Sequence, residues 1–594
     1  MNFLENRLLV RDFFLRSWRP YMCLTFVCFL LYFPLFTFSE YTYLDDHFLI
    51  VESFSYIHKL SDIGHAFLED VSHQAQGGNL YRPMLTASLI LSAQISGIAP
   101  FGYHLLDIML HCASCCLLFA ILQIFGFKRS ISFCGTLFFC VHPAITQAVA
   151  WIPGRNDSLL AIFILSAFIT YIKFLSSSSL KWYVFHLLCF ILAMFTKESA
   201  IMLPFIALWY SLSLRREKVF SLTTILLLAG WGIVIVNWYV MRSTAQIVPV
   251  GDKFQAAIAI FSNFRIVLFY FGKIFWPFDL SYAPVISDIH ITAGIISLGL
   301  LFLFVFYSER KDWNLIIFGV IWFIVFLIPT FFRTPKFYEH RIYIPFIGIL
   351  IILLSLSFAN LKPFLKRIVP FATTIAFCVL VWISYTHAFD FKNYMSLIEF
   401  DAKTSPNDLG RYNIITRMFI PKRLSSEINS LQGVSRQSKD TSITLPKEKL
   451  WKTIDDFKKE LKSNQNDPEL RHALAVAYFA RGLLLSSEKN FLAAIQGKPQ
   501  DSNVPYNLGI LYYSAHEEKK AEKAWLEALR LDSTMGKAHH NLSFLYYESG
   551  QNGLAWLHCQ KAIQCGIQIS PEFIKEIQKK PFMNVHEKEI GVKY

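Results

Sequence analysis

The sequence predicts an all-α protein: a multi-pass membrane helix bundle followed by a soluble array of helical repeats. The first observation is an uneven distribution of charge, with 46 Asp, Glu, Lys and Arg residues among the first 388 positions and 53 among the last 206. A typical soluble domain carries about 25% charged residues, so only the second part matches that composition. The second observation is a period of 34 residues within this second part. We therefore expect a membrane domain over 1–389, a linker over 390–447 and a repeat domain over 448–594.

The membrane domain contains eleven stretches that are long and apolar enough to be predicted as spanning helices. A spanning helix needs about 20 mostly apolar residues, because unpaired backbone groups cannot be left in hydrocarbon. Two further stretches, 84–97 and 262–276, are shorter and are predicted to lie at the interface or to re-enter the membrane. The predicted spans are 21–39, 104–125, 131–149, 158–175, 181–197, 199–213, 219–241, 291–308, 313–331, 342–359 and 368–388.

Basic residues predict the orientation of these spans. Four arginines precede the first span, and each later loop on the same side contains Lys or Arg, as in Lys128-Arg129 and Arg310-Lys311. Short basic loops remain in the cytoplasm, so we expect a cytoplasmic N-terminus and an extracytoplasmic repeat domain. The membrane would be a bacterial inner membrane or the endoplasmic reticulum, with lipids as neighbours. Because the basic residues are scattered over loops, we expect no nucleic-acid partner.

Three copies of a 34-residue unit make up about half of the charged part, at 468–501, 502–535 and 536–569. Each unit repeats a Leu followed by a small residue, then a Tyr and an Ala, and this pattern resembles the tetratricopeptide repeat. Such arrays form α-solenoids whose groove binds proteins, although a packing domain or spacer is the alternative. The linker before them includes a candidate degenerate helical pair. The recurring positions are Leu474, Leu508 and Leu542; Ala475, Gly509 and Ser543; Tyr478, Tyr512 and Tyr546; and Ala494, Ala528 and Ala562.

The longest loop of the membrane domain, 40–103, is predicted to be extracytoplasmic and contains the adjacent acids Asp45 and Asp46. One carboxylate could take the proton of a hydroxyl acceptor while the other orients it or holds a cation. A helix cap is the equally weighted alternative, because Asp is favoured at that position. We expect no certain cofactor, with a divalent Mg²⁺ or Mn²⁺ ion left open.

Further polar residues fall on the predicted outer side. Charges next to a membrane are costly to bury and are usually functional, and an Arg fork suits a phosphate group. His104 and His111 share one helix face and are predicted to line a cavity, or else to be satisfied within the bundle. Nine of the eleven cysteines lie in or beside apolar stretches and are interpreted as small apolar residues, and no metal-ligand spacing is present. The remaining candidates are Tyr81, Arg82, His142, Arg155, Asp157, Lys197, Glu198, Glu339 and Arg341.

These motifs, in this order, resemble the transmembrane and tetratricopeptide-repeat O-mannosyltransferases, which are C-type (GT-C) membrane glycosyltransferases. The matching stretches include Leu44-Asp45-Asp46, Tyr81-Arg82-Pro83 and Ile152-Pro-Gly-Arg155-Asn-Asp157. They continue through Thr196-Lys197-Glu198 to Glu339-His340-Arg341, where His340 separates two residues that the family usually has adjacent.

The resemblance implies transfer of a sugar, usually mannose or another hexose, from a polyprenyl-phosphate donor to Ser or Thr of a protein on the extracytoplasmic face. It implies Asp45 or Asp46 as catalytic base. The donor phosphate and sugar would be bound by Arg82, His142, Arg155, Asp157, Lys197, Glu198, Glu339 and Arg341. Two alternatives remain: an O-antigen-type glycan polymerase or ligase, and a non-enzymatic membrane anchor for a repeat scaffold.

Overall fold

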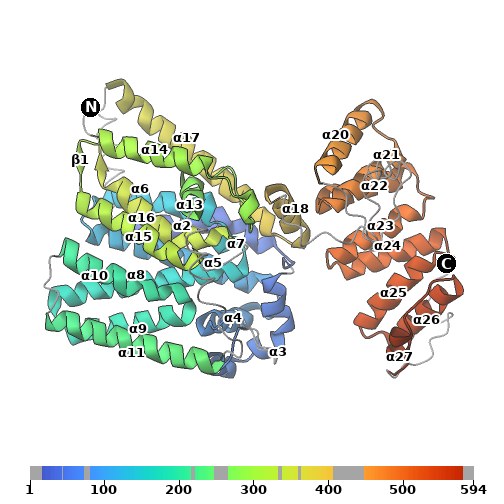
Figure 1. Ribbon diagram of the computed structural model, residues 1–594, viewed down its shortest axis with the longest axis horizontal. Helices are drawn as coiled ribbons and strands as arrows, with labels where there is room; N and C mark the ends of the chain where they lie inside the picture. The colour runs from blue at the N-terminus through green and yellow to red at the C-terminus, as the bar shows by residue number, and fades with distance from the viewer. Residues whose placement is uncertain are drawn as a thin grey trace. The chain divides into compact units, whose positions relative to one another are not determined.

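The computed structural model describes residues 17–42, 44–71, 80–215, 221–245, 265–331, 337–358, 363–405 and 447–579. The chain divides into two compact units, Met1–Asn393 and Tyr394–Tyr594. Both are built from helices (Figure 1). The described residues contain a single two-stranded sheet, in which β1 (Arg310–Lys311) pairs antiparallel with β2 (Leu356–Ser357). The all-α prediction is confirmed.

The first unit is a multi-pass membrane bundle. Six of its described helical segments are long and apolar enough to cross a membrane, and the bent pair Arg129–Cys140 and Pro143–Ala150 would be a seventh. All eleven predicted stretches coincide with apolar helices, but several of these are shorter than a full span, among them α9 (Leu180–Thr196) and α14 (Thr292–Tyr307). The six candidate spans are Arg19–Thr37, Pro100–Ile124, Ile152–Ser177, Leu222–Ala245, Trp313–Phe331 and Arg367–Phe391.

The two stretches predicted not to span are short helices, α4 (Pro83–Ser96) and α13 (Arg265–Phe275). Nine of the 14 residues of α4 are buried, which includes Ser88 and Ser92. It packs against α5 (Pro100–Ile124) and α9. A helix of this length with a polar face is stable here because its serines have partners inside the protein.

A buried ion pair connects α4, α5 and α8 (Arg155–Ser177). Arg155 Nε donates to Asp107 Oδ1 at 2.6 Å, and both side chains are fully buried. Arg155 Nη1 donates to Ser92 Oγ at 3.0 Å, and Nη2 donates to the Tyr103 carbonyl at 2.8 Å. A charge at this depth needs both a counter-ion and satisfied donors, and α5 and α4 supply them.

The second unit contains the repeats. It begins with α18 (Tyr394–Thr404) and continues with α20 (Lys447–Ser463). The first helix of the pair expected in the linker matches α18, while 406–446 lie outside the described residues. Each predicted repeat folds as two packed helices, and α27 (Pro571–Lys579) follows the last. The pairs are α21 (Pro468–Ala480) with α22 (Leu484–Gly497), α23 (Asn503–Ser514) with α24 (Glu518–Leu531), and α25 (Gly536–Glu548) with α26 (Asn552–Gln564).

The recurring residues explain the close packing of these pairs. Tyr512 of α23 donates to Glu488 Oε1 of α22 at 2.8 Å, and Tyr546 of α25 donates to Glu522 Oε1 of α24 at 2.6 Å. The same hydrogen bond therefore joins each helix pair to the next, 34 residues apart. Gly509 faces Trp525 of the partner helix, and a Cβ added there would lie 2.4 Å from the indole ring. The small residue in the pattern therefore sets the distance between the two helices.

We predict that Gly509→Ala lowers the stability of the second unit. Ala is favoured over Gly within a helix by about 1 kcal/mol, so the substitution would increase the stability of the unit if packing were unaffected. The added methyl group meets the buried ring of Trp525, and overpacking of this kind costs about 1–3 kcal/mol. Hydrogen exchange of α23 and α24 in the full chain measures the change. Lys523→Ala, on the exposed side of α24, is the control and should be nearly neutral. Increased protection in the Gly509 variant would contradict this packing.

Candidate functional site

A cavity of the first unit has a volume of about 640 Å³ and is lined by residues from several segments. The first loop lines one part of it with Asp45 and Phe48, and Arg82 adds the residue before α4. The first turn of α8 and the turn after α9 line a second part. The end of α15 (Trp313–Phe331) and the segment 338–345 complete the wall. A cavity of this size, with apolar walls and a few charged groups, is typical of a small-molecule site.

Six of the thirteen predicted site residues line this cavity, although they come from four distant parts of the sequence. The other seven do not line it. The lining residues are Asp45, Arg82, Asp157, Lys197, Glu198 and Arg341. The seven outside are Asp46, Tyr81, His104, His111, His142, Arg155 and Glu339.

The structure gives the two adjacent acids different surroundings. Asp45 is exposed and lines the cavity. Asp46 is buried, and its carboxylate accepts backbone N–H bonds from Thr42 at 2.6 Å, His47 at 2.9 Å and Leu44 at 3.1 Å. Burial raises the pKa of Asp46, while these bonds oppose that shift. Asp46 therefore holds the loop that carries Asp45. Its side chain caps the helical turn His47–Glu52, so the alternative of a helix cap describes Asp46.

Two ion pairs bring basic groups to the cavity wall. Arg82 Nη2 lies 3.3 Å from Glu198 Oε2. Lys197 Nζ donates to both carboxylate oxygens of Asp157 at 2.8 Å. Burial lowers the pKa of Lys197 to about 8, with the positive charge of Arg82 adding to the effect and Asp157 opposing it. The ammonium group is thus held charged near neutral pH mainly by one carboxylate.

Arg341 differs from these cations because no acidic side chain pairs with it among the described residues. Its guanidinium lies 5.3 Å from the centre of the Tyr338 ring, and its Nη1 is buried without a hydrogen-bond partner in the described part of the chain. A buried guanidinium nitrogen without an acceptor is unfavourable, so this position favours an anionic ligand. Arg341 is the strongest candidate for a phosphate contact.

Aromatic residues that the sequence analysis did not select form one wall of the cavity. Trp151 and Tyr338 stack with ring centres 5.8 Å apart and planes inclined by 10°. His340, also in the wall, has its Nε2 3.7 Å from Asp157 Oδ2. Trp151 directly precedes the Ile-Pro-Gly-Arg motif, and this position next to a motif is the sequence feature that could have indicated its place in the cavity wall. Flat apolar rings beside charged groups suit a ligand with both a ring and an anion.

Arg155, which was predicted to bind the donor, does not line the cavity. Each of its three guanidinium nitrogens donates a hydrogen bond inside the protein, and the side chain is fully buried. Asp107 already neutralises its charge. Arg155 was selected as a phosphate-binding fork, but the same fork geometry serves equally well to bind a buried carboxylate.

Glu339 is also outside the cavity, for a similar reason. Its carboxylate lies 3.0 Å from Lys273 Nζ and accepts a 2.6 Å bond from the Ser281 backbone N–H. His387 Nε2 lies 3.8 Å from its other oxygen. Glu339 thereby anchors the segment whose next two residues, His340 and Arg341, face the ligand space.

The remaining predicted residues also lie outside the cavity. His142 Nε2 lies 2.9 Å from the Ile274 carbonyl, and Tyr81 donates to the Phe67 carbonyl at 2.7 Å. His104 is buried and does not line the cavity, and its Nδ1, 4.0 Å from Asp107 Oδ2, has no hydrogen-bond partner among the described residues. His111 belongs to a separate buried cluster, described below.

Part of the chain is similar to proteins named O-mannosyl-transferases. It is 36% identical over 109 residues to the human Protein O-mannosyl-transferase TMTC1, which is 18% of this chain and 12% of that protein. It is 33% identical over 136 residues to the mouse Protein O-mannosyl-transferase TMTC3, covering 22% and 14%, and 33% identical over 126 residues to human TMTC2, covering 20% and 15%. The chain thus spans less than a sixth of the length of these relatives. No family model matches. The resemblance predicted from the motifs is confirmed.

Solved structures add little. The APC/C hetero-tetramer Cut9-Hcn1 has a TM-score of 0.21 at 13% identity, covering 84% of this chain and 89% of that chain. MamA AMB-1 has a TM-score of 0.19 at 20% identity, covering 26% and 88%. Similarity at this level does not bear on the fold, which rests on the helices described above.

We predict that binding of an anionic ligand in the cavity weakens as pH rises through about 8. Lys197 is charged below its pKa and neutral above it, so the cavity loses a positive charge across this range. A short prenyl phosphodiester is the appropriate probe, because its own charge stays constant. Loss of one charged contact corresponds to about a tenfold weaker affinity, measured by calorimetry in detergent. Lys197→Arg, which stays charged, should bind equally on both sides of this range, and a persistent pH dependence in that variant would refute the role of Lys197.

Proposed function

We propose that this protein is an integral-membrane glycosyltransferase. It transfers a sugar, mannose or another hexose, from a polyprenyl-phosphate donor to a hydroxyl group of Ser or Thr in a protein. The observation that carries this proposal is the cavity in which an exposed carboxylate, Asp45, shares one space with Arg82, Lys197 and Arg341. The names of the relatives, which are O-mannosyl-transferases, agree with it.

The basic groups supply the electrostatics that a phosphate leaving group requires. As the bond between the anomeric carbon and the phosphate oxygen breaks, negative charge develops on the phosphate. Arg341 has a buried donor without a partner, while Lys197 and Arg82 keep donors beyond their acidic partners. The sugar ring would lie against the wall of Trp151 and Tyr338.

Asp45 is the proposed general base. The acceptor oxygen forms a bond to the anomeric carbon, the phosphate departs with the electron pair of the broken bond, and the hydroxyl proton passes to the Asp45 carboxylate. A general base must be able to reach that proton, and an exposed carboxylate at the cavity rim can do so. Asp46 is not proposed as the base, because it is buried and does not line the cavity, and it already accepts three backbone N–H bonds.

The proposed site is extracytoplasmic. Three helices of the bundle have a cavity residue at one end and a basic residue near the other. Helix α8 runs from Asp157 toward Lys173, α9 runs from Lys181 to Lys197, and α15 starts after Lys311 and ends at the cavity. Basic loops remain cytoplasmic, so the cavity opens on the opposite side.

The repeat unit is proposed to bind the protein acceptor or a partner that delivers it. Helical repeats present extended surfaces, and the three repeats of this unit share one continuous hydrophobic core. Transfer to a small acceptor would then need only the first unit.

Replacement of the base is the first test. Asp45→Asn should reduce transfer by about 10²–10⁴-fold, because the proton acceptor is lost while the loop keeps its Asp46 bonds. Transfer from a polyprenyl-phosphate-linked mannose to a Thr-containing peptide is measured by mass spectrometry. Glu52→Gln is the matched control, since Glu52 is an exposed acid of the same loop that does not line the cavity. Full activity of Asp45→Asn would exclude the proposed mechanism.

Truncation is the second test. A chain lacking 424–594 should retain transfer to a short peptide but lose most transfer to a folded protein acceptor. A membrane anchor for a scaffold would show no transfer in either form. Complete loss of transfer to both acceptors in a truncated protein that still melts cooperatively would contradict the separate roles of the two units.

A further inference from the structure

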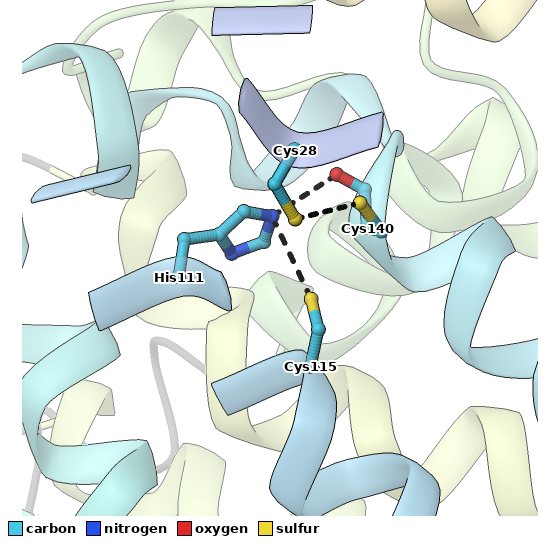
Figure 2. A group of neighbouring side chains, drawn as sticks. All are labelled: Cys28, His111, Cys115 and Cys140. Carbon is cyan, nitrogen blue, oxygen red and sulfur yellow. Dashed lines mark hydrogen bonds between the residues drawn. The ribbon is translucent and has the colours of Figure 1, made fainter. Parts of the chain in front are cut away.

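Three cysteines and one histidine meet inside the membrane bundle, away from the cavity (Figure 2). Cys28 comes from α2 (Arg19–Tyr32), His111 and Cys115 lie one turn apart on α5, and Cys140 ends α6 (Arg129–Cys140). All four side chains are buried, and none lines the cavity. Their potential ligand atoms lie within 4.8 Å of one another.

This spacing suits one tetrahedral metal ion. In a zinc site with bonds of about 2.3 Å to sulfur, neighbouring ligand atoms are about 3.8 Å apart. Cys115 Sγ lies 3.8 Å from His111 Nε2, and Cys28 Sγ lies 3.0 Å from Cys140 Sγ. Shifts of about one ångström would place all four atoms around a common centre. Three thiolates and an imidazole are a donor set that selects zinc.

The histidine presents one nitrogen to the sulfurs and has the other held by a partner. His111 Nδ1 lies 2.7 Å from the Tyr343 hydroxyl, and Nε2 lies 3.0 Å from the Cys140 carbonyl, to which Nε2–H donates. Metal-binding histidines usually have the second ring nitrogen held by a partner such as Tyr343. On metal binding, Nε2 gives up its proton and its bond to the Cys140 carbonyl, and Nδ1–H donates to the Tyr343 oxygen.

We propose that Cys28, His111, Cys115 and Cys140 bind a structural zinc ion. The site is closed, because four protein ligands complete the tetrahedron and leave no open position for a substrate. Binding displaces the thiol protons to solvent, and the ion then connects α2, α5 and α6. Through Tyr343 it also supports the start of α16 (Tyr343–Leu354), two residues after Arg341.

A nearby cysteine provides a matched control. Cys116 lies on the same helix as His111, and its thiol lies 4.0 Å from the Thr25 hydroxyl. It is not among the four clustered residues. Removing it tests the effect of a lost thiol without removing a ligand.

The test is the metal content of the full chain, purified under reducing conditions and washed with EDTA. Mass spectrometry of metals should find about one zinc per chain, and zinc X-ray absorption should give three sulfur ligands and one nitrogen ligand. Cys28→Ser with Cys140→Ser should lose the zinc, as should His111→Ala, while Cys116→Ser retains it. The wild-type measurements remain decisive if a ligand variant fails to fold.

Other outcomes would overturn the proposal. Wild-type protein without stoichiometric metal, or a ligand variant that keeps its zinc, would exclude the site. Copper or iron in place of zinc would refute the assignment of the ion. A disulfide between Cys28 and Cys140, found by peptide mass spectrometry without reduction, would show that these sulfurs pair with each other instead.

Discussion

The buried ion pair between Asp107 and Arg155 illustrates the constraint on which the membrane unit depends: a charge inside an apolar bundle needs a partner. Either residue alone would leave an uncompensated charge, which destabilises a protein by about 3–5 kcal/mol. Together with Ser92 and the Tyr103 carbonyl, the pair fixes α4 and α5 against the start of α8. The first turn of α8 then presents Asp157 to the cavity. Glu339 acts in the same way, since its pairing with Lys273 holds the segment that carries His340 and Arg341.

The same constraint separates structural charges from functional ones. Arg155 and Asp46 are held by hydrogen bonds inside the protein, and Glu339 is held through its Oε1 by Lys273 and the Ser281 backbone N–H. Asp45 is exposed, whereas Arg341 has a buried nitrogen without an acceptor among the described residues. Two adjacent aspartates, identical in chemistry, therefore differ in surroundings: Asp45 is exposed at the cavity, whereas Asp46 is buried and accepts three backbone N–H bonds.

Local features of the sequence were sufficient to predict the helices. Apolar stretches such as 104–125 coincide with α5, and the period of 34 residues coincides with the paired helices of the repeat unit. The predicted span 131–149 is broken in the structure: α6 ends at Cys140, and the chain bends by 58° before Pro143–Ala150, because Pro143 interrupts the apolar run.

The site was less predictable because it depends on contacts between distant residues. Arg82, Lys197 and Arg341, which were predicted to bind the donor, line the cavity, yet nothing local distinguishes them from Arg155, whose partner lies 48 positions away. Likewise, Cys28 and Cys140 are 112 positions apart, so the cluster around His111 has no spacing motif to reveal it. In both examples, the surroundings of the residue depend on which helices pack together, and this packing cannot be read from local sequence.

The central claim is that the cavity lined by Asp45 and Arg341 transfers a sugar from a lipid-linked donor. The most direct measurement is transfer by the purified full chain from a synthetic polyprenyl-phosphate-linked mannose to a Thr-containing peptide, with the product mapped by mass spectrometry. The account predicts a hexose on the Thr hydroxyl and inhibition by excess polyprenyl phosphate, which competes for Arg341 and Lys197. Absence of transfer from this donor, with transfer from a nucleotide sugar instead, would contradict it.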